Sequence, residues 1–175
     1  MRSRSADNRT ALLDAARTGV AERGIEATTA RDIATRANTS LGAISYHFGT
    51  TRALINEALA QAMLEAVEAI ASRRLPVELL LEDAVRAAGA QRGLAAAAFE
   101  AAAAAARDPS DHQVRDHYRS LRHAISRATE PALGQLDAML VAALIDGIAL
   151  HALIDDEVTA ALAELASRAA WLVRP

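Results

Sequence analysis

The sequence predicts an all-α protein of about nine helices, an expectation that rests on three observations. Alanine is abundant along the chain, and no run of β-branched residues suggests a strand. There are only four prolines. Hydrophobic residues make up 52% of the chain, which excludes a disordered protein, and aromatic residues only 3%. A chain of 175 residues can bury a sizeable core, as one domain or as two small domains that share a core.

Capping signals mark the first two expected helices. An apolar stripe over residues 8–23 predicts the first helix, and Gly24 follows it where a C-cap glycine belongs. The second helix starts at Thr29, because Thr29 and Asp32 have the spacing of a capping box.

A polar hinge, residues 38–40, precedes a short third helix that is expected over about residues 41–48. Residues 49–51 end this helix and cap a long fourth helix, about residues 52–73. Further helices are expected from Pro76 to near Gly89 and over about residues 95–106, 110–128, 136–154 and 155–173.

Local signals separate the later helices from one another. Asp108 and Pro109 end the alanine-rich helix, and Ser110 with Gln113 forms a second capping box. Pro131 then separates two helices.

The stretch over residues 138–154 is nearly apolar and could suggest a membrane span. It contains Asp146, Gly147 and His151, and it is about one turn shorter than the ~20 residues of a comfortable span. We therefore expect a core helix or a subunit interface rather than a membrane helix. No apolar stretch follows the N-terminal arginines, so we predict no signal peptide and expect a cytoplasmic protein.

Charge is distributed unevenly along the chain. The net charge of −3 alone argues against binding to nucleic acid. Residues 1–52, however, hold eight arginines against five acidic residues, whereas residues 53–175 hold eleven arginines against seventeen acidic residues. This asymmetry predicts a basic N-terminal module on an acidic body.

Residues 30–49 have the pattern of a helix-turn-helix motif. Ala34 is small enough for two helices to cross closely, and Asn38 falls in the turn, where φ is usually positive. Ile44 and Phe48 are expected to face the core. Eight residues are then expected to face outward: Thr39, Ser40, Leu41, Gly42, Ala43, Ser45, Tyr46 and His47.

This outer face is slim, as a helix must be to enter the major groove of DNA. Its hydroxyl, phenol and imidazole groups can bond phosphates or base edges, and Thr29 heads a helix whose N-terminus suits a phosphate. The alternative interpretation is an ordinary helical hairpin that carries a tyrosine and a histidine on its surface.

The same segment carries a resemblance to a known family. Residues 9–55, which include "LLDAARTGVAERGIEATTARDIATRANTSLGAISYHFGTTRALI", resemble the N-terminal domain of the TetR family of bacterial transcriptional regulators. The resemblance implies an all-helical homodimer that binds pseudo-palindromic double-stranded operator DNA and is released by a small molecule. It implies a helix-turn-helix DNA-binding domain over residues 1–50 and a ligand-binding and dimerisation domain over residues 51–175.

The resemblance also implies roles for single residues. Tyr46 and His47 match positions that contact the DNA backbone, and Thr29 matches a phosphate contact. Leu41, Gly42, Ala43 and Ser45 lie in the recognition helix. This chain departs from the family pattern in three places: Val20 stands for a frequent Phe, Asn38 for Gly, and Thr51 for a phosphate-binding Lys that Arg52 could replace.

The stretch "AALIDGIALHALID" is similar to the family's penultimate helix, which pairs across the dimer. We expect a small-residue strip to face the partner and a leucine-rich face to pack in the subunit's own core. The expected strip is Ala142, Ala143, Asp146, Gly147 and Ala149, and the expected core face is Leu136, Leu140, Leu144 and Ile148. A monomeric bundle with these helices inside is the alternative.

An effector pocket is implied among the fourth to eighth helices. Alanines there either leave room for a ligand or let the helices pack tightly, and the sequence leaves both open. Asp146 in an apolar helix needs a partner, which His151 or an arginine could supply. The candidate ligand-binding residues are Met63, Phe99, Ala103, Tyr118, Leu121, Arg122, Asp146 and His151.

No enzyme, metal site or cofactor is predicted. The chain has no cysteine, which excludes a disulfide framework and a cysteine-based zinc site. His112 and Asp116 have metal-ligand spacing but lack a third clustered ligand. Together with the TetR resemblance, the sequence predicts a DNA-binding repressor that a small molecule releases from its operator. The alternative is a helix-turn-helix regulator controlled by a protein partner or by no ligand.

Overall fold

The computed structural model describes residues 2–107, 112–129 and 132–172. Within these ranges the chain forms ten helices and no strand, which confirms the expected all-α class. The helices are α1 (Arg2–Arg23), α2 (Ala30–Arg36), α3 (Leu41–Phe48), α4 (Thr51–Ala71), α5 (Val77–Ala90), α6 (Arg92–Ala105), α7 (His112–Ala128), α8 (Gln135–Ile154), α9 (Asp156–Ala160) and α10 (Leu162–Trp171).

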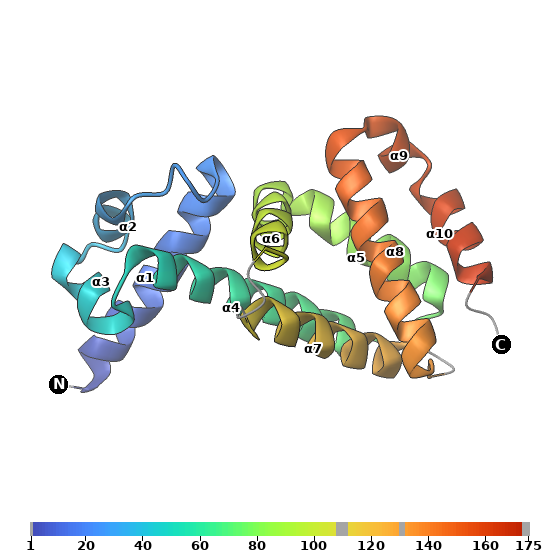
Figure 1. Cartoon of the computed structure of the whole chain (residues 1–175), viewed down its shortest axis with the longest axis horizontal. Helices are drawn as coiled ribbons and strands as arrows, with labels where there is room; N and C mark the ends of the chain where they lie inside the picture. The colour runs from blue at the N-terminus through green and yellow to red at the C-terminus, as the bar shows by residue number, and fades with distance from the viewer. Residues whose placement is uncertain (1, 108–111, 130–131, 173–175) are drawn as a thin grey trace.

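The molecule is elongated, with the two termini at opposite ends (Figure 1). Helices α1, α2 and α3 form a head at one end, and α4 runs from this head into a body made of the later helices. Helix α7 lies along α4, whereas α8 and α10 stand at the far end of the body. Helix α4 thus belongs to both head and body, and α6 of the body also packs against the head core.

Two main cores stabilise the molecule. The head core buries large aliphatic side chains of α1, α2, α3 and the first half of α4, including Leu12, Ile33, Ile44 and Leu54. The body core joins α5, α7, α8 and α10 around smaller residues, and eight of its thirteen buried members are not leucine or isoleucine. A third, small cluster connects Val85 with Ala149, Ala152 and Leu162.

The helix boundaries differ from the expected ones at both ends of the chain. Helix α1 begins at Arg2 instead of residue 8, since no proline or glycine precedes the apolar stripe to stop it. The single last helix expected over residues 155–173 was wrong: Ala161, with φ −90° and ψ 4°, divides it into α9 and α10. This break turns α10 back along α5. Asp108, Pro109, Ser110 and Pro131, with the signals assigned to them, lie outside the described residues.

The expected assignment of the faces of α8 was partly wrong. Ala142 and Ala149 are buried in the subunit's own core, whereas Leu136 is 79% exposed and Leu140 39% exposed. Because α8 is apolar on almost every side, its sequence pattern gives no rotational phase. Ala143 and Gly147 are exposed as expected. The buried face of α8 consists of Ala138, Val141, Ala142, Ile145, Ala149 and Ala152.

By length and composition, α8 is also the one helix among the described residues that could cross a membrane. Its buried side chains pack against α5, α7 and α10 in the body core. A core helix of a folded body passes the same length test, so we interpret α8 as such a helix.

Candidate functional sites

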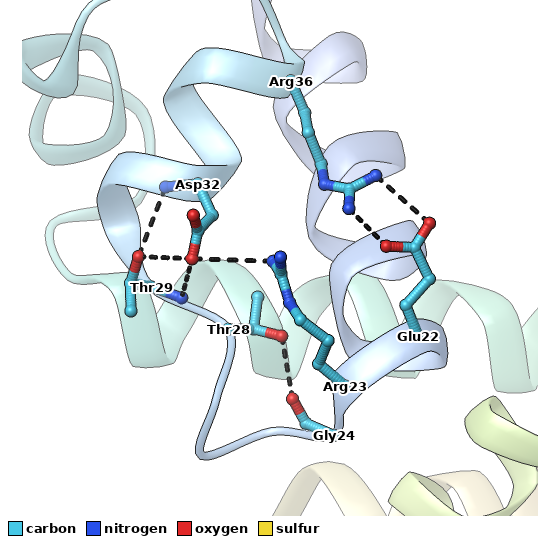
Figure 2. A network of polar contacts seen from close by, with 7 residues as sticks. All are labelled: Glu22, Arg23, Gly24, Thr28, Thr29, Asp32 and Arg36. Atoms are coloured by element: carbon cyan, nitrogen blue, oxygen red, sulfur yellow. Dashed lines mark hydrogen bonds and ion pairs between the residues drawn. The ribbon is translucent and has the colours of Figure 1, made fainter.

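A polar network fixes α2 on the last turn of α1 (Figure 2). Arg36 donates to Glu22, with one bond of 3.2 Å, and the Arg23 guanidinium lies 3.5 Å from Asp32. The Thr28 hydroxyl donates to the carbonyl of Gly24 at 2.8 Å. The network therefore attaches both ends of α2 to the C-terminal end of α1.

The expected capping box at the start of α2 is present. The Thr29 hydroxyl accepts from the Asp32 backbone N–H at 3.3 Å, and the Asp32 carboxylate accepts from the Thr29 backbone N–H at 3.4 Å. The Thr29 hydroxyl itself donates to Asp32 at 2.6 Å, and this bond is the main reason why the pKa of Asp32 is lowered. Thr29 thus already has a structural partner, and a phosphate contact there stays a prediction.

The turn between α2 and α3 has the conformation that the sequence indicates. Asn38 has φ 49°, the positive value expected for this position, and it is the one non-glycine among the described residues with positive φ. The Thr39 N–H donates to the carbonyl of Ala34 at 3.0 Å, which closes the turn. Gly49, with φ 77°, ends α3 in a conformation that side chains disfavour.

Helix α3 presents a polar outer face and an apolar inner face. Ile44 is 3% exposed and Phe48 packs on the head core, as expected. Ala43 is half-buried and also packs on that core, so its expected outward position was wrong. It adjoins Ile44 at the edge of the inner face. Tyr46 is 80% exposed, and Leu41, Ser40, Gly42 and Ser45 are exposed as well, whereas Thr39 and His47 are half-buried.

Aromatic contacts hold the end of α3 in place. The rings of Tyr46 and His47 meet edge to face with centroids 4.9 Å apart. Below them, the Arg9 guanidinium lies 5.2 Å from the centroid of Phe48 and also bonds Glu57 of α4. The inner ring is therefore anchored between α1 and α4, while Tyr46 remains free to touch a ligand.

The start of α4 adds a second polar edge beside α3. Thr50 caps this helix, since its hydroxyl accepts from the Ala53 N–H at 3.1 Å. Thr51 is half-buried in the first turn, and Arg52 is exposed with Glu26 at 3.9 Å. A pair this long between two exposed side chains is weak, so Arg52 can exchange it for a phosphate.

Arg31 is a candidate DNA-contacting residue that the sequence pattern did not indicate. It is exposed in the first turn of α2, and within the described part of the chain no ion pair engages it. Five other arginines of the head pair with a carboxylate: Arg9, Arg17, Arg23, Arg36 and Arg52. The sequence could have indicated Arg31, because it directly precedes the capping residue Asp32 in the first turn of α2.

Comparison with known proteins agrees with this geometry. Residues 12–58 match the family model described as bacterial regulatory proteins, tetR family. The match spans α2, the turn, α3 and the α1 and α4 segments that hold them. Over these residues the chain carries a DNA-binding domain of the TetR family. It is a DNA-binding transcriptional regulator with a helix-turn-helix head.

Solved structures share the fold over almost the whole chain. SCO7518 from Streptomyces coelicolor A3(2) is 24% identical and has a TM-score of 0.74, with 93% of this chain and 98% of that chain covered. Salmonella enterica GusR is 21% identical at a TM-score of 0.68, with 95% and 93% covered. The multidrug-binding protein EbrR, in its ethidium complex, is 26% identical at a TM-score of 0.63, with 93% and 97% covered. No curated protein sequence matches this chain.

The predicted effector residues do not form one cluster. Tyr118 and Leu121 of α7 lie with Asp146 of α8 at the body core. Phe99 packs elsewhere, against the small cluster around Val85. Met63 and Arg122 are half-buried on α4 and α7, and Ala103 and His151 are exposed.

Tyr118 and Asp146 form a polar pair across α7 and α8. Burial raises the pKa of Asp146 to about 6, and the hydrogen bond from Tyr118 partly opposes this rise. Burial and the nearby Asp146 charge raise the pKa of Tyr118 to about 12. The partner of Asp146 is thus Tyr118, and the expected partners, His151 or an arginine, were wrong. Next to this pair, burial lowers the pKa of His117.

Proposed function

We propose that this TetR-family regulator is a cytoplasmic homodimeric repressor that a small molecule releases from its operator. In this proposal residues 1–50 form the DNA-binding domain, and residues 51–175 bind the ligand and dimerise. The proposal rests mainly on the exposed outer face of α3, which includes Tyr46. The inner face of this helix is anchored by the contact of Phe48 with Arg9.

DNA contact would follow from this face. Leu41, Gly42 and Ser45 would enter the major groove, and Tyr46 and His47 would touch the backbone beside it. Arg31 and Arg52 flank the helix with positive charge that phosphates attract.

The far end of the body supports a dimer. Exposed apolar side chains gather on α8 and α10, on the surface that the body's own core leaves open. Ala143 and Gly147 lie among them and allow a second helix to approach closely. A second copy would cover this face with its own α8 and α10. The residues concerned are Leu136, Met139, Leu140, Leu150, Ile154, Trp171 and Leu172.

The Tyr118–Asp146 pair supports a cationic aromatic effector. Asp146 has no ion pair within the described residues. With a pKa of about 6, its carboxyl group is mostly ionised at pH 7. An aromatic cation would supply the missing positive charge and stack on Tyr118. EbrR binds ethidium, proflavin and malachite green, which makes these dyes suitable first probes.

Selection from a random DNA library tests the repressor proposal. The expected product is a pseudo-palindrome with half-sites about one helical turn, ~34 Å, apart. If no sequence is enriched, or if the enriched sequence has a single half-site, the dimeric repressor is contradicted.

Ethidium titration then tests the effector assignment. Binding should release the selected operator, and Asp146→Asn should weaken ethidium binding by roughly tenfold, because a charge-assisted contact is lost. Asp137→Asn is the matched control, since Asp137 is an exposed carboxylate on the same helix. Equal ethidium affinity in the wild type and in both variants would show that the effector does not bind at Asp146.

A further inference from the structure

The first turn of α6 is in direct backbone contact with the last turn of α1. A Cβ atom placed on Gly93 would lie 1.8 Å from the carbonyl oxygen of Ala21 and 2.7 Å from its carbonyl carbon. No side-chain rotation can relieve such a clash, because both partners are main chain. Only glycine therefore fits at position 93 with the helices at this distance.

The rest of α6 continues this contact along the head. Ala97 is 3% exposed and belongs to the head core, although it lies far along the chain from α1 to α3. Leu94 and Ala101, on the same side of α6, pack against the same core. One face of α6 thus completes the core of the DNA-binding head.

The opposite side of α6 is joined to the proposed dimerisation helices. The Arg92 guanidinium donates to the carbonyl of Leu153, near the end of α8. Phe99 packs against the cluster that contains Ala149 and Ala152 of α8 and Leu162 of α10. Helix α6 therefore lies between the head and the end of the body, as Figure 1 also shows.

The contact at Ala21 falls where the helix-turn-helix is attached. Glu22, Arg23 and Gly24, the next three residues, bond α2 and the loop before it (Figure 2). A displacement of this turn would carry α2, and with it α3, in the same direction. Position 93 can thus move the recognition helix without touching DNA.

We propose that Gly93 is a positioning residue that sets the separation of the two recognition helices in the dimer. Helix α6 is then a second connection between body and head, in addition to α4. A methyl group at position 93 must move the helices apart by roughly 1.5 Å to reach an ordinary C···O distance. This tilts the head, and the half-site spacing that the dimer accepts changes. The inference rests on the proposed dimeric function.

The first test compares Gly93→Ala with Gly89→Ala on operators of different spacing. Gly89 lies in α5, and a Cβ atom placed on it would meet no atom within 4 Å, so it is the matched control. On the operator selected with the wild-type protein, Gly93→Ala should bind about tenfold more weakly, and an operator with one base pair added or removed should recover part of the loss. Gly89→Ala should behave like the wild type. A folded, dimeric Gly93→Ala with unchanged affinity and spacing preference would overturn the proposal.

A second test measures the head directly and needs no DNA. The chain has no cysteine, so Ala27→Cys and Ala87→Cys, both at exposed positions of head and body, take spin labels cleanly. Labelled chains are diluted into unlabelled protein, and the distance within one chain is measured. Gly93→Ala should shift this distance, and Arg92→Ala, a change at an exposed side chain, should broaden it because the link to α8 is lost.

The two tests separate the failure of this inference from a failure of the proposed function. If Gly93→Ala does not fold, the distance between the two spin labels in Arg92→Ala tests whether α6 positions the head. An unchanged distance distribution in the folded variants overturns the role of α6, whatever the protein binds. A wild type that neither dimerises nor binds DNA, together with a shifted distance, would instead contradict the proposed function and leave the contact of α6 with the head established.

Discussion

The head and the body of the molecule use different means to bury their helices. The head packs large aliphatic side chains and attaches α2 with capping and ion-pair contacts. The body packs many alanines, keeps the polar Tyr118–Asp146 pair at its core, and leaves an apolar face exposed on α8 and α10. A head whose helices are fixed by large side chains and polar caps suits the recognition of one fixed partner. The body keeps a carboxylate without an ion pair among the described residues and an exposed apolar face, and both suit the binding of further molecules.

The largest expected effect is at the exposed apolar face of the body. Ala143→Arg would place two arginines close together across the two-fold axis, and their repulsion and desolvation should yield monomers. Ala87→Arg, on an exposed face of α5, should leave the dimer intact. Sedimentation at micromolar protein measures both. A monomeric wild type would show that the apolar face has another role.

The head should depend strongly on single aliphatic side chains. Ile33 is fully buried, so Ile33→Ala should lower the free energy of unfolding by roughly 3 kcal/mol, whereas Leu41→Ala, at an exposed position, should cost less than about 1 kcal/mol. Urea unfolding followed by circular dichroism compares the two variants. A loss for Leu41→Ala as large as that for Ile33→Ala would mean that Leu41 also packs in the head core.

The polar pair in the body should make stability depend on pH. The pKa of Asp146 is raised from 3.8 to about 6, so the folded state holds the proton more tightly. Stability from this group is therefore full below pH 3.8 and decreases as the pH rises toward about 6. Asp146→Asn cannot ionise, and it should gain on the order of 1 kcal/mol relative to the wild type between pH 4 and pH 7.

Unfolding measured at several pH values checks this expectation. Asp137→Asn, at an exposed carboxylate on the same helix, should follow the wild-type profile. Parallel profiles for Asp146→Asn and the wild type would show that the carboxylate is solvated like a surface group.

A smaller effect is expected from the charges that flank α3. Arg31→Ala and Arg52→Ala should each reduce the slope of log affinity against log salt by about one unit, equally for all DNA sequences. Arg74→Ala, at an exposed position in the loop after α4 and far from the head, is the control. Loss of discrimination between operator sequences, with an unchanged slope, would make the arginine a base reader instead.

The same contrast explains how much the sequence could predict. In the head, local signals determine the structure: the capping residues Thr29 and Asp32, the positive φ of Asn38 and the inward Ile44 were all expected. The helix-turn-helix and most of its outer face therefore followed from the residues alone, although Ala43 and Arg31 were misjudged or missed.

The body offered fewer such signals. Alanine suits both a core and a surface, so the pattern could not show that Ala142 faces inward and Leu136 outward. The partner of Asp146 comes from α7, a long-range contact that no local spacing reveals. The contact between Gly93 and Ala21 is of the same kind, because it joins helices more than seventy residues apart.

The role of the outer face of α3 is tested most directly by the effect of Tyr46→Ala on DNA binding and on stability, measured in the same protein. Because the Tyr46 side chain is 80% exposed, we expect an unchanged melting temperature and weaker binding to the selected operator. A strongly lowered melting temperature with unaltered DNA affinity would contradict it, since the outer face of α3 would then serve the fold and not the DNA.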